Sequence, residues 1–393
     1  MTDEQLTRRQ LIERGALGAA AISLPAILAA CGGSSGIKGG AQTTGATTAT
    51  VDRTLAKTLT ISNWPLYIDI DEKTKKRPTI EQFQKEFGVT VKYIEDVNDN
   101  DQFYGKVQAQ LRNGQSIGRD IMVLTDWMAA RMVRLGWVEP LDKQSIPNAK
   151  NLVSALASPG WDPQRTYSLP WQSGMTGIAF NPKLTGGPVD SIDRLLTDKK
   201  LKGKVTLLTE MPDTVGLVML SNGDNPSKVD DASFKRAIDK IKKAVDSGQI
   251  RQFTGNDYAP LLAKGDVWAA TAWSGDVVQL QADNPHLEYV IPDSGGMIWT
   301  DNMLIPKKGK VYTASVFMNY VYRPKVAAQI EDYVNYICPV EGAKDVLLKS
   351  DPAVAKNGLI FPPQSTLDKV HIFDAKAADT KAYKEQFQTL VGA

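Results

Sequence analysis

The sequence predicts an α/β protein that folds into two lobes, each with a mostly parallel sheet flanked by helices. The chain has 393 residues, which is too long for one small domain and suits two lobes or two domains. Its composition, 42% hydrophobic and 23% charged, is that of an ordinary globular protein. Two successive regions alternate between strand-like and helix-like spacing of apolar residues, which is typical of parallel sheets covered by helices.

The first α/β region begins at residue 57 and alternates regularly between strand and helix. Its strands are predicted from short apolar or alternating runs, and its helices from apolar residues spaced three or four apart. Phe103, Val107 and Leu111 show the helical spacing, and Gly88 supplies a helix stop signal. The predicted strands cover residues 57–62, 89–94 and 120–124, and the predicted helices cover residues 79–87, 103–111 and 127–135.

The second α/β region follows after a break. The residues between 232 and 245 form an amphipathic helix with Phe234, Ala237 and Ile241 on its apolar side. Its lysines are interpreted as a solvated face. The predicted strands cover residues 176–180, 204–208, 267–271 and 302–306, and a long, mostly helical stretch covers residues 316–337.

The first thirty-one residues are predicted to be an export signal and not part of the fold. Arg8 and Arg9 resemble the paired arginines of a twin-arginine signal. The apolar run at residues 15–30 is interrupted by Pro25 and is too short to cross a bilayer. Its length therefore argues against the alternative of a transmembrane anchor.

Cys31 closes this segment after two alanines and precedes a glycine, a pattern that resembles a bacterial lipobox. The resemblance implies that Cys31 becomes the lipidated first residue of the mature chain. The alternative is a small-residue cleavage site with an incidental cysteine. Residues 32–56 are small and polar and are predicted to form a flexible linker. If Cys31 is lipidated, Cys338 is the one cysteine left, and no intrachain disulfide is expected.

Charge and motifs exclude several classes of function. The 46 basic and 44 acidic residues give a net charge of +2, without the basic stripe of a nucleic-acid-binding protein. No phosphate-binding or dinucleotide-binding motif is present, and His286 and His371 lack neighbours at metal-ligand spacing. The pattern Gly-x-Ser-x-Gly at residues 114–118 follows a helix and precedes a strand, the reverse of a nucleophile elbow. We interpret it as a turn, and we expect neither a cofactor nor an enzymatic activity.

Aromatic residues stand beside carboxylates at four places, each at or next to the end of a predicted strand. Because ligand crevices of open α/β sheets form at such strand ends, the four clusters are expected to share one site. A ring attracts an organic ammonium group, and a carboxylate accepts its hydrogen bonds. The alternative is that the tryptophans pack the core and the aspartates cap helices. The clusters lie at Trp64 to Tyr67, Thr125 to Trp127, Trp273 to Asp276, and Trp299 to Asp301.

At these clusters, the sequence resembles that of the spermidine/putrescine-binding proteins of polyamine ABC transporters. These proteins are bacterial extracellular solute-binding proteins. The resemblance extends from about residue 59 to about residue 363, and the Gly-Gly-x-x-Trp-x-Asp segment at residues 295–301 is its most specific part. It implies a two-lobed, type II periplasmic-binding-protein-like fold with the ligand cleft between the lobes. Such lobes close on their ligand by hinge motion.

The resemblance also implies where the chain passes between the lobes. Crossings are expected near Ser173, near Thr300 and after about residue 340. Lobe 1 would then comprise residues 57–173 and 301–345, and lobe 2 would comprise residues 174–300 and 346–393.

Carried over residue by residue, the resemblance assigns Asp276 and Asp301 to the amino groups of the ligand. It places Glu210 and Asp213 one residue away from positions 211 and 214, where polyamine-binding proteins often have carboxylates. Cys338 stands where some members have a tyrosine. The identity of the amine therefore stays open. The predicted ligand-binding residues are Trp64, Tyr67, Thr125, Asp126, Trp127, Glu210, Asp213, Trp273, Asp276, Trp299 and Asp301.

The sequence thus predicts a monomeric, lipid-anchored protein on the outer face of the cell membrane or in the periplasm. It would capture a small cationic amine, a polyamine above all, and deliver it to the permease of an ABC importer. One alternative is a protein of the same fold for another amine, an amino-acid derivative or an anion; an arginine among residues 210–214 would favour an anion, and none is present. An exported hydrolase that uses Ser116, and a surface protein whose cleft senses or adheres, are the remaining functions compatible with the sequence.

Overall fold

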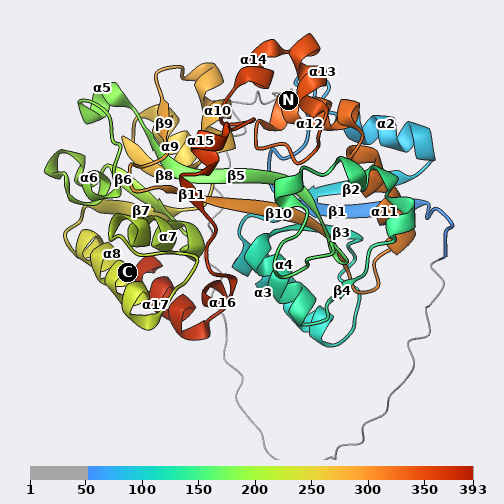
Figure 1. Cartoon of the computed structure of the whole chain (residues 1–393), viewed down its shortest axis with the longest axis horizontal. Helices are drawn as coiled ribbons and strands as arrows, with labels where there is room; N and C mark the ends of the chain where they lie inside the picture. Colours follow the sequence, from blue (N-terminus) through green and yellow to red (C-terminus); the bar gives the residue numbers. More distant parts are fainter. Residues whose placement is uncertain (1–51, 393) are drawn as a thin grey trace, which may run out of the picture.

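The computed structural model describes residues 52–392, which form two lobes joined by one continuous sheet (Figure 1). Along the sheet, the strands follow the order β2-β1-β3-β10-β5-β8-β6-β7, with β4 and β11 paired to β10 and β9 paired to β5. Strands β1 to β3 are parallel to one another, as are β6 to β8. The predicted α/β class with two lobes is therefore confirmed. The predicted export signal and Cys31 lie outside the described residues.

The first lobe holds the parallel strands β1 to β3 and the helices around them. Gly88 adopts a φ of 67° and ends α2, as the sequence predicts. All six elements predicted for this region are present. Their bounds are β1 (Thr58–Asn63), α2 (Pro78–Phe87), β2 (Thr90–Glu95), α3 (Asn100–Arg112), β3 (Ile121–Thr125) and α4 (Asp126–Arg134). A short strand that was not predicted, β4 (Val138–Glu139), follows them. Three short 3-10 helices follow at Lys143–Ser145, Pro147–Asn151 and Ser154–Leu156.

The second lobe holds the parallel strands β6 to β8. Helix α8 buries Phe234, Ala237 and Ile241, so the predicted apolar face is confirmed. The strands are β6 (Val205–Leu208), β7 (Ile250–Thr254), β8 (Ala269–Trp273) and β9 (Glu288–Val290). The helices are α5 (Pro182–Thr185), α6 (Ile192–Thr197), a 3-10 turn (Lys199–Leu201), α7 (Met211–Ser221), α8 (Asp231–Asp246), α9 (Tyr258–Lys264) and α10 (Ser274–Asp283).

Two long strands, β5 (Ser168–Phe180) and β10 (Gly296–Pro306), run between the lobes and pair antiparallel with each other. β10 pairs with β3 of the first lobe, and β5 pairs with β8 of the second. Ser173 lies opposite Thr300 in their register. The sequence predicted only one end of each strand, because every residue of β5 is buried and a fully buried strand lacks alternation.

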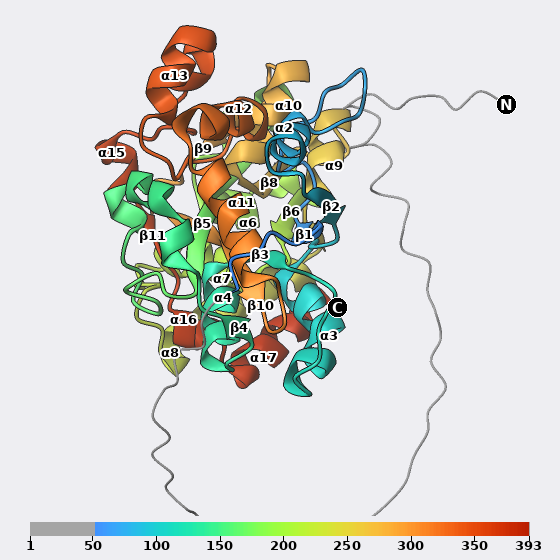
Figure 2. The ribbon, with the colours of Figure 1, turned by 90° about the vertical axis from the view of Figure 1, so that its right-hand side faces the viewer.

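The predicted helical stretch at residues 316–337 consists of two helices. α11 (Val311–Val321) ends before Arg323, and α12 (Pro324–Val334) begins at a proline, whose ring cannot continue a preceding helix. Asn335 then adopts a φ of 59° and ends α12, and the chain becomes extended, so that Ile337 forms a bridge with Ser173. Figure 2, seen from the side of the first lobe, shows α11 in front of the strands.

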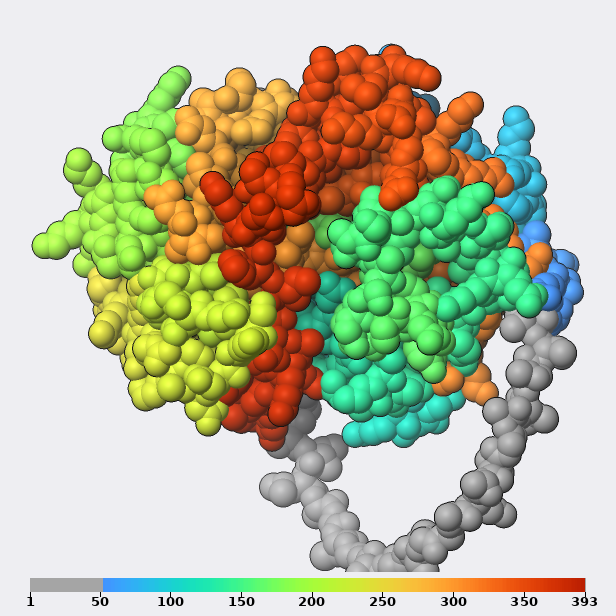
Figure 3. Space-filling model, in the orientation of Figure 1, coloured from blue at the N-terminus to red at the C-terminus, as the bar shows by residue number. Residues whose placement is uncertain are grey.

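The C-terminal segment contacts both lobes and lies over the boundary between them (Figures 1 and 3). α13 packs on α12, and β11 pairs with β10. α16 contacts α4 of the first lobe, and α17 packs on α8 of the second. The bounds are α13 (Ala343–Ser350), α14 (Pro352–Lys356), α15 (Gln364–Leu367), β11 (Val370–His371), α16 (Ala375–Ala378) and α17 (Lys381–Val391).

Two further features bear on the sequence predictions. Residues 114–118 form the predicted turn between α3 and β3, with Gly114 and Gly118 at φ values of 65° and 69°. The Ser116 hydroxyl accepts a hydrogen bond from the Gly118 amide, which is a local turn contact. Among residues 52–392, no helix is both long and apolar enough to cross a membrane.

Candidate ligand-binding site

A cavity of about 180 Å³ lies between the lobes, and all eleven predicted ligand-binding residues line it. The loop after β1 supplies Trp64 and Tyr67, and the junction of β3 with α4 supplies Thr125, Asp126 and Trp127. The loop into α7 and its first turn supply Glu210 and Asp213, the junction of β8 with α10 supplies Trp273 and Asp276, and β10 supplies Trp299 and Asp301. Three of the four sequence clusters thus meet at strand ends, whereas the fourth lies inside β10, which begins earlier than the sequence predicted.

Asp301 lies near the point where β10 passes between the lobes. Its carboxylate accepts hydrogen bonds from the Tyr67 hydroxyl at 2.9 Å and from the Thr125 hydroxyl at 2.7 Å. The residue is only 3% exposed. Burial is the main cause that raises the pKa of Asp301 to about 7, because the charged form loses its hydration. The two hydroxyls orient the carboxylate, yet they leave its charge without a counter-cation.

Asp276 occupies the first turn of α10 and accepts three hydrogen bonds. The donors are the Asn256 amide at 2.9 Å and the hydroxyls of Tyr258 and Tyr336, each at 2.7 Å. Burial raises the pKa of Asp276, and these hydrogen bonds partly offset that effect. The carboxylate is therefore held rigidly by neutral groups.

Asp213 lies in the first turn of α7, one residue before position 214, where the resemblance led us to look for a carboxylate. It accepts hydrogen bonds from the Thr176 hydroxyl at 2.7 Å and from the Trp273 indole at 2.9 Å. Burial raises its pKa to about 6. Thr214 instead turns its hydroxyl back to the carbonyl of Leu208. Position 213, and not position 214, thus presents the acidic group to the cavity.

Glu210 lies just before α7 and is linked to Asp301 through the first lobe. The amide nitrogen of the Asn100 side chain donates to Glu210 at 3.2 Å and to the Thr125 hydroxyl at 2.8 Å, and Thr125 in turn donates to Asp301. Burial raises the pKa of Glu210 well above its usual value, and the charges of Asp99 and Asp213 add to this. Glu210 therefore belongs to the Asp301 end of the cavity.

Asp126 differs from the other carboxylates because its oxygens are bound to β10. It accepts hydrogen bonds from the Thr300 amide at 3.1 Å and from the Asn302 side chain at 2.8 Å. Burial raises its pKa to about 6. These contacts tie the start of α4 to β10, so that Asp126 positions Asp301 and Thr125 in addition to lining the cavity.

Aromatic rings form the walls between these carboxylates. Trp273 and Trp299 meet edge to face with ring centroids 6.4 Å apart, and Tyr336 lies 5.7 Å from Trp299 and 5.2 Å from Tyr67. The indole nitrogen of Trp64 is buried and has no hydrogen-bond partner among the described residues. The walls are thus apolar faces that suit a hydrocarbon chain or a cation.

Two glycines permit this close packing. A Cβ atom on Gly174 would lie 2.5 Å from the ring of Trp299, and one on Gly275 would lie 2.2 Å from the ring of Tyr336. Such distances are far below van der Waals contact, so any side chain at either position displaces a wall of the cavity. The backbone at these two positions therefore sets the shape of the site.

Sequence reasoning missed the three residues that donate hydrogen bonds to Asp276, along with other residues that line the cavity. Tyr336 and Asn256 line it, and Tyr258 holds Asp276. No local pattern marks them, since Tyr336 arrives from the extended segment after α12 and Asn256 from the loop after β7. Cys338, which the sequence singled out, is buried and does not line the cavity.

The fold and the cavity define a two-lobed binding protein with an acidic, aromatic cleft. The chain belongs to the family of bacterial extracellular solute-binding proteins, whose family model matches residues 79–361. It is 32% identical to the putrescine-binding periplasmic protein PotF of Escherichia coli over 347 residues, which cover 83% of this chain and 88% of that protein.

Two further comparisons agree with this assignment. The spermidine/putrescine-binding periplasmic protein 1 of Haemophilus influenzae is 26% identical over 315 residues, covering 80% of this chain and 85% of that protein. The structure of a putative spermidine/putrescine ABC transporter from Listeria monocytogenes superposes with a TM-score of 0.74 at 27% identity, covering 86% of this chain and 98% of that one. The protein is therefore a solute-binding protein with a periplasmic-binding-protein fold.

Proposed function

We propose that this protein binds a polyamine of the putrescine or spermidine class between its lobes and delivers it to an ABC importer. The observation that carries the proposal is the charge of the cavity wall. Five carboxylates line the cavity, and no lysine, arginine or histidine of the described residues does so. Such a wall favours a cation, and it disfavours the anionic ligand that the sequence left open as an alternative.

Three of the carboxylates are buried without a cationic partner among the described residues. Asp213, Asp276 and Asp301 accept hydrogen bonds only from hydroxyl, amide and indole groups. Burying an unpaired carboxylate costs several kcal/mol. A ligand with two or three ammonium groups would remove this cost and form charge-assisted hydrogen bonds.

The aromatic walls suit the rest of such a ligand. An ammonium group over a ring gains about 2 kcal/mol when it is desolvated, and each buried methylene group contributes about 0.8 kcal/mol. A four-carbon diamine has about six heavy atoms, so its binding free energy is limited to about −9 kcal/mol. That limit corresponds to an affinity near micromolar, which suits a scavenging receptor.

The two lobes are proposed to close on the ligand about the strands that join them. Lobe 1 would comprise residues 57–173 and 301–345, and lobe 2 residues 174–300 and 346–393. The facing residues Ser173 and Thr300, whose hydroxyl oxygens lie 3.0 Å apart, support a hinge at this point. The closed form would then dock on the permease without any chemical step.

Export and anchoring are proposed from the sequence alone. Cys31 in its lipobox-like context supports a lipid anchor on the outer face of the cell membrane, and residues 32–56 would separate the globular body from the membrane. We expect the receptor to act as a monomer.

Calorimetric titration of the ligand-free mature protein with putrescine, cadaverine, spermidine and spermine tests the proposal. We expect one-to-one binding of at least one amine. Asp301→Asn keeps the shape of the side chain but removes its charge, and we expect it to lower the affinity roughly a hundredfold, since a buried charged hydrogen bond contributes up to about 3 kcal/mol.

Asp69→Asn is the matched control. Asp69 is also buried, and burial also raises its pKa, but it accepts its hydrogen bonds from Thr79 and Gln329 and does not line the cavity. We expect this variant to bind like the wild type. If the folded wild type shows no heat with any of the four amines, the polyamine assignment is wrong and another solute must be sought.

A further inference from the structure

A second cavity, of about 170 Å³, adjoins the ligand cavity at its Asp301 end. The two cavities share Trp127, Glu210 and Pro212 as lining residues. Asp99 and Asp101 of the first lobe line the second cavity, and α17 closes it with a row of side chains. A ligand that extends from Asp301 past Glu210 would therefore enter this second cavity.

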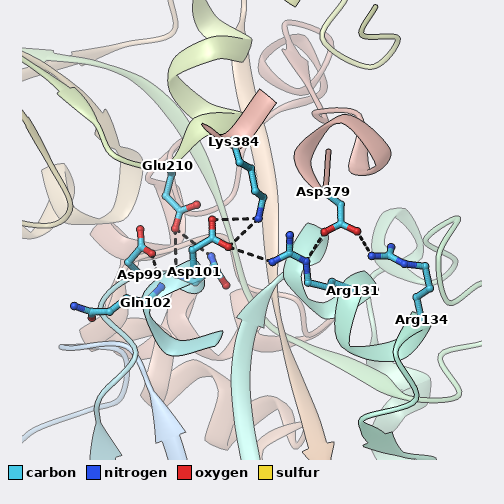
Figure 4. A network of polar contacts seen from close by, with 9 residues as sticks. Asp99, Asp101, Gln102, Arg131, Arg134, Glu210, Asp379 and Lys384 are labelled. Carbon is cyan, nitrogen blue, oxygen red and sulfur yellow. Dashed lines mark hydrogen bonds and ion pairs between the residues drawn. The ribbon is translucent and has the colours of Figure 1, made fainter. Parts of the chain in front are cut away.

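The second cavity already contains an ammonium group, which belongs to Lys384 of α17 (Figure 4). Its nitrogen lies 2.8 and 3.2 Å from the two carboxylate oxygens of Asp101 and 4.5 Å from the ring centroid of Trp127. The side chain is only 12% exposed. Lys384 is thus bound as a ligand ammonium would be, by a carboxylate and an aromatic face.

Contacts with both lobes hold Lys384 in this place. On the second lobe, Tyr383 stacks on Phe234 with centroids 4.0 Å apart, and Phe387 packs against Phe253. On the first lobe, Arg131 joins Asp101 to the C-terminal segment through an ion pair with Asp379, as Figure 4 shows. The packing of its neighbours on both lobes therefore directs the Lys384 side chain into the cavity.

We propose that Lys384 is a specificity-determining residue that limits the length of the ligand, so that the protein prefers a short diamine to a longer triamine. This inference rests on the proposed polyamine function. The lysine occupies the place beyond Glu210 where a further amino group would bind. Its positive charge also repels a second cation in the same cavity.

A purely structural role for Lys384 makes a different prediction. The Lys384–Asp101 ion pair joins α17 to α3 and hence one lobe to the other. If the pair served only to hold the lobes closed, its loss would weaken the binding of every amine by the same factor. The ratio of the triamine affinity to the diamine affinity therefore distinguishes the two roles.

The test is calorimetric titration of the wild type and Lys384→Ala with putrescine and spermidine. We expect the wild type to prefer putrescine, and we expect the variant to raise the spermidine-to-putrescine affinity ratio at least tenfold. Lys384→Met keeps the apolar stem over Trp127 and removes the charge, so it should raise the ratio as well, and it serves if the alanine variant is poorly folded.

Lys381→Ala is the matched control, because Lys381 lies one turn earlier on α17, is 87% exposed and pairs only with Glu385 among the described residues. We expect it to leave the ratio within twofold of the wild type. An unchanged ratio in both Lys384 variants would overturn the inference while leaving the polyamine function intact. Absence of amine binding by the wild type would overturn the proposed function, and the inference with it.

Discussion

The two adjoining cavities are built from the same chemical groups, and they differ in whether the protein supplies the cation. In the second cavity, Asp101 is paired with Lys384 and Arg131, and the ring of Trp127 lies over the ammonium. In the ligand cavity, the hydrogen bonds that Asp276 and Asp301 accept from the described residues come from neutral groups. Under the proposed function, this cavity takes its ammonium group from the ligand.

Under the proposed function, this difference explains how a chain with a balanced net charge can select a cation. A carboxylate with an internal counter-ion contributes to the fold and has little left to offer a ligand. A carboxylate held only by hydroxyls and amides is oriented but electrostatically incomplete. The affinity for a ligand therefore comes from the charges that the fold leaves unpaired, and not from the number of acidic residues in the chain.

The largest expected effect comes from making the same substitution in the two cavities. Asp276→Asn removes an unpaired charge, and we expect it to lower putrescine affinity roughly a hundredfold because a charge-assisted hydrogen bond is lost. Asp101→Asn leaves Lys384 without its partner carboxylate, and we expect it to lower the unfolding free energy by about 1–3 kcal/mol while changing putrescine affinity less than tenfold. Titration calorimetry and thermal unfolding measure both quantities, and equal losses of affinity in the two variants would erase the distinction.

A smaller effect is expected from pH. Burial raises the pKa of Asp301 to about 7 and that of Asp213 to about 6. A cation binds the ionised form, so putrescine affinity should fall about tenfold as the pH is lowered from about 8 to about 6. The amine itself stays charged throughout, because aliphatic ammonium groups titrate near pH 10. Calorimetry in buffers of different ionisation enthalpy should show protons released on binding at about pH 6 and almost none at about pH 8.

The stability of the ligand-free protein should respond with the opposite sign. A carboxylate whose pKa is higher in the folded state than in the unfolded state binds more protons when folded, so its contribution to stability is present below about pH 4 and is lost as the pH rises to about 7. The increase in melting temperature caused by putrescine should therefore be larger at about pH 8 than at about pH 6. Asp69→Asn should retain the pH dependence of putrescine affinity. If this variant lost that pH dependence, the effect would belong to a carboxylate outside the cavity.

Much of the fold and the candidate site could be predicted from the sequence because the signals were local. Alternating apolar residues indicated the strands of both lobes, and apolar residues three or four apart indicated their helices. Aromatic–carboxylate pairs next to predicted strand ends indicated residues that the sheet brings together. The strands β5 and β10 were predicted too short, since β5 is fully buried and β10 nearly so, which leaves no alternation to detect. The break before Pro324 was missed because the apolar residues on both sides suggested one helix.

The parts that escaped prediction depend on the path of the chain in three dimensions. Tyr336 reaches the cavity only because α12 ends at Asn335 and the chain then runs beside β5. Lys384 is one of two lysines on a polar-looking C-terminal helix, and nothing in the neighbouring sequence distinguishes it from Lys381. Lys384 is buried and Lys381 is exposed because of the way the C-terminal segment crosses between the lobes.

The most direct test of the central claim compares putrescine with 1,4-butanediol, which has the same length and the same hydrocarbon chain but carries no charge. Both are titrated into the ligand-free protein under the same conditions at about pH 8. If unpaired carboxylates select the ligand, putrescine binds near micromolar affinity and the diol binds at least a thousandfold more weakly, a difference of about 4 kcal/mol. Comparable affinities for the two compounds would contradict the account, because the aromatic walls alone would then be responsible for recognition.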